Sequence, residues 1–136
     1  MNPIFIGMNP TKARYRKGCA WFRFQDWTDE MGIHRFTFTN LSFDPHWDKK
    51  RVDYEFLSES LEGHDRIVAL GGMVSGHLGK MGISHYTLPH PSPLNRQINN
   101  LAYISQRLQE CKEYLHEDID NRGCGVYRLP YSQTLS

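Results

Sequence analysis

The sequence predicts an α/β fold: a single three-layer α/β/α domain with a central, mostly parallel four-stranded sheet. Segments typical of strands alternate with amphipathic segments typical of helices along the chain. The segment 66–72 is a nearly continuous apolar run, as in strands that are buried on both faces. The length of 136 residues fits one domain. We therefore expect one domain over 1–136, with 117–136 as a C-terminal tail.

Each element follows from its own pattern. The expected strands are 3–7, 35–41, 66–72 and 84–89, and the expected helices are 19–32, 51–63, 73–82 and 98–115. In the first helix, apolar residues recur at spacings of three and four and leave Phe22 off the apolar stripe, which is Trp21, Phe24, Trp27 and Met31. The last helix has the clearest stripe: Ile98, Leu101, Ile104, Leu108, Cys111 and Leu115.

Composition narrows the function classes. The formal net charge is +1, so a nucleic-acid partner would need a local basic patch. The three cysteines are far apart, which argues against a disulfide framework and excludes a four-cysteine iron–sulfur cluster. We expect no metal and no cofactor. The chain has no apolar run of membrane-spanning length and no signal-peptide pattern, and we expect a reducing cytoplasm.

Polar residues follow three of the four expected strands. Parallel strands end at one edge of the sheet, where ligands bind in this class of fold. Asn9, Asn40 and His90 would therefore converge there, beside the two glycines Gly71 and Gly72 that end the third strand.

His90 lies in a loop that three prolines stiffen, Pro89, Pro91 and Pro93. A ring held this firmly is suited to donating one hydrogen bond to an anion that develops during a reaction. The ordinary alternative is a loop histidine that binds a backbone carbonyl.

Asn9 and Asn40 carry amides. The oxygen of Asn9 could orient a water without acting as a strong base. The donor and acceptor of Asn40 match the edge of a pyrimidine. The alternatives are a turn residue for Asn9 and a cap of the next turn for Asn40.

Aromatic and basic residues surround the expected crevice. One aromatic residue near the first loop could stack on a flat ligand, although most of them are expected in the core. Basic residues that could bind the phosphates of a nucleic acid lie near the loops after the first, second and fourth strands. They are Lys12, Arg14, Arg16, Lys17, Arg23, Lys49, Lys50, Arg51 and Arg96.

Two segments, "IGMNPT" (6–11) and "HPSPLNRQINN" (90–100), together resemble the signature motifs of the uracil-DNA glycosylase superfamily. The resemblance is closest to the single-strand-selective monofunctional type, with Gly-Met-Asn-Pro and His-Pro-Ser-Pro followed by an Asn. "FTFTNL" (36–41) is similar to the strand with the base-reading Asn, and "ALGGMVSGHL" (69–78) to the strand and helix before the histidine loop. The resemblance spans about residues 3 to 108. The chain is shorter than typical members of the superfamily and in this is similar to compact phage-type relatives.

The resemblance implies a role for each matched residue. Asn9 would position the hydrolytic water, His90 would hydrogen-bond O2 of the departing uracil, and Asn40 would read the base. The implied substrate-binding residues further include Gly7, Met8, Pro10 and one of Trp21 and Phe22. Leu94 would wedge into the duplex, and the implied DNA-binding loop comprises Ser92, Leu94, Asn95 and Arg96.

The implied activity is monofunctional removal of uracil or a modified pyrimidine from single- or double-stranded DNA, by a monomer in a bacterial or phage-infected cell. Thr11 stands where Gly is common in the closest family motif. The Asn-Pro-Thr turn also lacks the Tyr with which some members exclude the methyl group of thymine. The resemblance therefore does not specify which pyrimidine is removed. Two alternatives stay open: an inactive protein of this fold that binds nucleic acid or nucleotides, and related chemistry on free nucleotides.

Overall fold

The computed structural model describes residues 2–8, 20–42, 52–92 and 95–116, and within them it confirms the predicted α/β class. The strands are β1 (Ile4–Gly7), β2 (Thr37–Asn40), β3 (Ile67–Leu70) and β4 (Tyr86–Leu88). They form one sheet in the order β2-β1-β3-β4, in which every pair is parallel.

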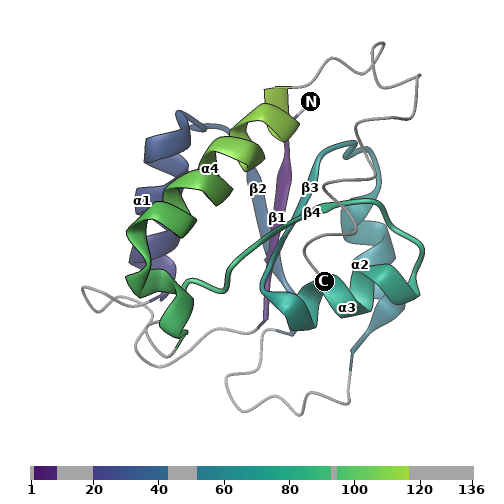
Figure 1. Cartoon of the computed structure of the whole chain (residues 1–136). Coiled ribbons are helices and arrows are strands. Elements are labelled where there is room, and N and C mark those ends of the chain that lie inside the picture. The colour runs from purple at the N-terminus through teal and green to yellow at the C-terminus, as the bar shows by residue number, and fades with distance from the viewer. Residues whose placement is uncertain (1, 9–19, 43–51, 93–94, 117–136) are drawn as a thin grey trace.

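Helices cover both faces of this sheet (Figure 1). The helices α1 (Ala20–Met31) and α4 (Leu101–His116) lie on one face, and α2 (Tyr54–Leu61) and α3 (Gly72–Lys80) lie on the other. The chain moves from β1 to β2 in one direction and then from β2 through β3 to β4 in the other. Right-handed crossovers place helices on opposite faces when the direction reverses.

Alternation along the strands divides the buried side chains between two cores. Phe5 packs with α1 and α4, whereas its neighbours Ile4 and Ile6 pack with α2 and α3. Both neighbours and Phe5 are 0% exposed. Because successive side chains of a strand point to opposite faces, the position of a residue along its strand determines which of the two cores it enters.

The last helix differs from its prediction at its start. A short 3-10 helix, η1 (Arg96–Asn99), comes first, and α4 begins only at Leu101. The side chain of Asn100 accepts a hydrogen bond from the amide of Tyr103 at 3.1 Å. This contact caps the N-terminus of α4, so η1 and α4 are two helices and not one. The expectation that Leu101 is a core residue is wrong: it is 78% exposed, because the first turn projects beside an open groove between α1 and α4.

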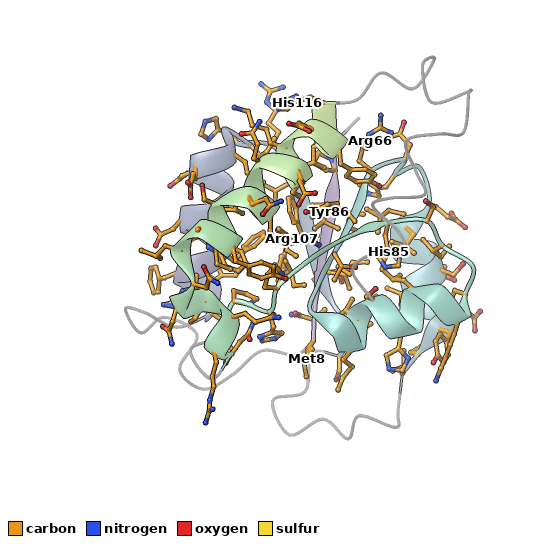
Figure 2. All side chains as sticks on the ribbon, viewed as in Figure 1. Met8, Arg66, His85, Tyr86, Arg107 and His116 are labelled. Carbon is orange, nitrogen blue, oxygen red and sulfur yellow. The ribbon has the colours of Figure 1, made fainter. Side chains whose placement is uncertain are left out.

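A buried chain of hydrogen bonds ties α3 to β4. The hydroxyl of Thr87 donates to Oγ of Ser75 at 2.9 Å, and that oxygen lies 2.7 Å from Nε2 of His85. Nδ1 of His85 lies 2.7 Å from the carbonyl of Ile83, which can only accept, so Nε2 is the acceptor for Ser75. Figure 2 shows His85 between the sheet and α3. Burial lowers the pKa of His85, against the opposing effect of the Ile83 carbonyl.

Among the described residues, no helix is long and apolar enough to cross a membrane.

Candidate functional site

All four strands end on the same side of the sheet, at the lower end of the view in which Met8 is labelled (Figure 2). The connections leaving β1 and β3 go in opposite directions along the sheet. In parallel sheets, the crevice that binds ligands lies at this reversal, beyond the carboxyl ends of the strands. A ligand site is therefore expected at the ends of β1 and β3.

The side chain of Asn40, at the end of β2, lies against the end of β1. Gly7 pairs with Asn40 in the parallel register of β1 and β2. A Cβ added at Gly7 would lie 2.6 Å from Oδ1 of Asn40 and 3.1 Å from Cζ of Phe38. The carboxamide of Asn40 thus occupies the space that a side chain at Gly7 would fill. Asn40 is buried, with 6% of its surface exposed.

The side chain of His90, which follows β4, lies against Gly71 at the end of β3 in the same way. Gly71 has a φ of 100°, and a Cβ there would lie 3.1 Å from Cβ and 3.2 Å from Cδ2 of His90. The amide of Gly71 donates to the carbonyl of Leu88 at 2.8 Å, which brings the end of β4 against this glycine. Gly71 therefore supplies both a backbone conformation that favours glycine and the room for the imidazole.

These two glycines lie close together. Ile6 is opposite Ala69, so Gly7 is one strand spacing from β3 and one residue short of Gly71 along it. Strands are about 4.8 Å apart and rise about 3.3 Å per residue, which separates the two glycine backbones by about 6 Å. Asn40 approaches from the β2 side and His90 from the β4 side. The two side chains thus lie over neighbouring strand ends.

The protonation state of His90 follows from its contacts. The backbone amide of Ser92 donates to Nδ1 of His90 at 3.1 Å. A neutral ring that accepts at Nδ1 carries its hydrogen on Nε2. Burial lowers the pKa of His90, and an amide donating to Nδ1 further disfavours a second proton there. His90 is therefore a neutral imidazole at pH 7, with Nε2 as its donor.

The loop after β4 is held at several points. The side-chain nitrogen of Asn95 donates to the carbonyl of His90 at 2.9 Å, and its oxygen accepts from the amide of Gln97 at 3.2 Å. A guanidinium nitrogen of Arg23 on α1 lies 3.5 Å from the carbonyl of Pro91. Arg96 is exposed at the start of η1.

The aromatic residues separate into two places. The ring of Trp21 lies 5.2 Å from that of Phe38 in an edge-to-face contact, and Phe38 is on the same face of β2 as Asn40. Phe22 is 37% exposed and lines a different recess, with Asp29 and Phe36. The structure therefore brings Trp21, and not Phe22, next to the strand that carries Asn40.

Several predicted site residues lie outside the described residues: Asn9, Pro10 and Leu94, and, among the basic residues, Lys12, Arg14, Arg16, Lys17, Lys49, Lys50 and Arg51. Among the described ones, Gly7 lies against Asn40, and His90 lies over Gly71 at the neighbouring strand end. Met8 lies at the same end, half-buried.

The sequence placed Gly71 beside the expected crevice but did not indicate Phe38 as a site residue. For Phe38 a signal existed, because Phe36, Phe38 and Asn40 alternate and must share one face of a strand.

Over the described ranges, no group of three or more His, Cys, Asp or Glu side chains is placed to hold a metal ion. No model of a known protein family matches the chain, and no curated protein matches it.

Proposed function

We propose that this protein is a monofunctional DNA glycosylase, which hydrolyses the N-glycosidic bond of uracil or a modified pyrimidine in DNA and leaves an abasic site. One observation carries the proposal: Asn40 and His90 lie over two glycines at neighbouring strand ends, and His90 is held as a neutral donor. The similarity of "IGMNPT" and "HPSPLNRQINN" to the glycosylase motifs supports the same activity.

Each side chain supplies one part of the chemistry. The target base leaves the stack and enters the crevice, because the glycosidic bond is out of reach inside a duplex. The carboxamide of Asn40 then pairs with the edge of the pyrimidine through one donor and one acceptor. As the C–N bond breaks, its electron pair moves onto the base, and Nε2–H of His90 donates to the oxygen that gains negative charge.

Water completes the reaction at the sugar. The amide oxygen of Asn9 orients a water toward the anomeric carbon, which has become positively charged. Once the new C–O bond has formed, the attached water passes its proton to bulk water. An amide suffices for this role, since such a cation needs little activation of its nucleophile. The proposal assigns hydrolysis by water and no Schiff base, in line with the monofunctional type that the motifs resemble.

The surroundings of the crevice suit a single flipped base in a DNA strand. Trp21 is the better placed of the two aromatic candidates for stacking on the base, because it contacts Phe38 beside Asn40. Ser92 and the exposed Arg96 are proposed to bind phosphates, and Leu94 to fill the space that the base vacates. The protein acts as a monomer and uses no cofactor in this proposal.

An oligonucleotide assay tests the activity. Single- and double-stranded oligonucleotides with one uracil, hydroxymethyluracil or thymine are incubated with the protein and then treated with alkali, which cleaves at abasic sites. We expect cleavage at the modified base, and its loss in Asn9→Ala and His90→Ala. The matched controls are Asn99→Ala and His34→Ala, two exposed residues to which the proposal assigns no role.

The outcomes separate the proposal from its alternatives. Binding of the oligonucleotides without release of any base favours an inactive nucleic-acid-binding protein. Cleavage that persists in His90→Ala contradicts the assigned role of the imidazole.

A further inference from the structure

Asn95 forms an unusual number of contacts within the loop that carries His90. Its side-chain nitrogen donates to the carbonyl of His90, and its side-chain oxygen accepts from Gln97. Its backbone amide donates to the carbonyl of Ser92 at 3.0 Å, and its carbonyl accepts from the amide of Ile98 at 3.3 Å. Two polar groups of Asn95 therefore bind the start of the loop, at His90 and Ser92, and the other two bind η1.

We infer that Asn95 is a positioning residue: its carboxamide holds the His90–Pro91 peptide so that the amide of Ser92 stays on Nδ1 of His90 and Nε2–H is directed at the substrate base. The inference rests on the proposed function for its consequence in catalysis. The effect on the imidazole itself is independent of any activity.

The need for such a residue follows from the prolines. Pro89 and Pro91 have no amide hydrogen, so neither can donate a backbone hydrogen bond to a neighbouring strand. Beyond Leu88 the sheet ladder has ended, and the carbonyl of His90 takes its hydrogen bond from a side chain instead. Without Asn95 this carbonyl would lose the donor that keeps its peptide plane in place.

The peptide plane of His90 and Pro91 connects the imidazole to its partner. Only that peptide and the φ and ψ of Pro91 separate His90 from the amide of Ser92. A rotation of the plane would move the amide of Ser92 away from Nδ1, and the ring would then lose the contact that sets its tautomer. Holding the carbonyl therefore also holds the protonation pattern of the ring. The charged side chain that the structure brings onto this loop from α1 is Arg23, whose guanidinium contacts the carbonyl of Pro91.

Three variants separate this role from a simple effect on stability. Asn95→Ala removes both the cap of η1 and the donor to His90. Asn95→Asp keeps a capping oxygen for Gln97 but replaces the donor with an acceptor facing the His90 carbonyl. Asn100→Ala is the matched control, because Asn100 also caps a helix through its side-chain oxygen but does not contact His90.

Nitrogen-15 NMR of histidine-labelled protein reads the imidazole directly. In the wild type we expect His90 to be neutral with hydrogen on Nε2 and to titrate below the ordinary histidine range. In Asn95→Ala and Asn95→Asp we expect a mixture of both tautomers and a titration midpoint nearer the ordinary value, whereas Asn100→Ala should match the wild type. The inference is overturned if both Asn95 variants are folded and keep the wild-type tautomer and titration, or if the wild-type ring carries its hydrogen on Nδ1.

The same variants are then measured for base excision. We expect kcat to fall roughly ten- to a hundredfold in both Asn95 variants, with KM changed much less, because a misplaced donor weakens the transition state more than ground-state binding. A wild type that excises no base would refute the proposed function, and the NMR result would still decide the role of Asn95. A kcat in Asn95→Asp equal to that of Asn100→Ala would contradict the positioning role.

Discussion

Gly7→Ala changes one hydrogen to a methyl group at the floor of the proposed site. The new Cβ would lie 2.6 Å from Oδ1 of Asn40, a distance that carbon and oxygen do not tolerate. Ordinary contact begins near 3.4 Å, so the carboxamide must move by about 0.8 Å. Cζ of Phe38, at 3.1 Å, limits relief in the other direction.

The displacement has two measurable consequences. Overpacking a buried position costs about 1–3 kcal/mol of the free energy of unfolding. A shift near 1 Å in a group that orients the substrate costs about a hundredfold in rate, which is about 2.7 kcal/mol in the transition state. We therefore expect kcat/KM for uracil excision to fall about a hundredfold in Gly7→Ala. Single-turnover cleavage of a uracil oligonucleotide and urea unfolding measure the two effects.

Gly76→Ala is the matched control for this substitution. Gly76 is exposed within α3, and a Cβ there has no atom within 4 Å. An alanine in a helix is favoured over glycine by about 1 kcal/mol, so this variant should be slightly more stable and fully active. The reasoning about the site is refuted if Gly7→Ala excises uracil within twofold of Gly76→Ala while both are folded.

Two further predictions concern the imidazoles. Gly71→Ala should lose about 1–3 kcal/mol of stability and at least as much activity as Gly7→Ala, because φ at Gly71 is 100° and the new Cβ meets His90; unchanged melting and excision rate would contradict this. Burial lowers the pKa of His85 and His90, so the unfolded chain binds protons that the folded protein does not. The free energy of unfolding should therefore fall as pH drops below about 6.5, by at most about 1.4 kcal/mol per pH unit for each histidine. Urea unfolding at pH 7.5 and pH 5 measures this pH dependence, which should be weaker in His85→Gln than in the wild type. The same pH dependence in both proteins would contradict the prediction.

Much of the fold could be predicted from local pattern. Alternation and apolar runs located all four strands, and the apolar stripe of the first helix matches its buried residues Phe24, Trp27 and Met31. The pattern could not show that the last helix begins at Leu101, because Ile98 and Leu101 continue its spacing on both sides of the break. The helix begins where the side chain of Asn100 caps it. Whether an Asn caps a new helix or continues an existing one depends on the surrounding fold, which the local pattern does not contain.

For the site, the sequence could predict that the loops after three strands lie at one end of the sheet. Asn40 ends β2 and His90 follows β4, and both were expected at one end of the sheet. The roles of Gly7 and Gly71 as the space for those side chains depend on strand order, which places β1 beside β3 although they are far apart in the chain. The contacts of Asn95 likewise depend on how the loop folds back, and composition alone carries no signal for them.

The central claim is that Asn40 and His90 hold one base between them, and a titration of the protein with free uracil tests it most directly. Nitrogen-15 NMR follows the side-chain amide of Asn40 and Nε2–H of His90 in the same samples, with adenine as the comparison ligand. We predict that uracil shifts both signals with one common Kd and that adenine shifts neither. Uracil that shifts only one of the two signals, or neither, would contradict the account.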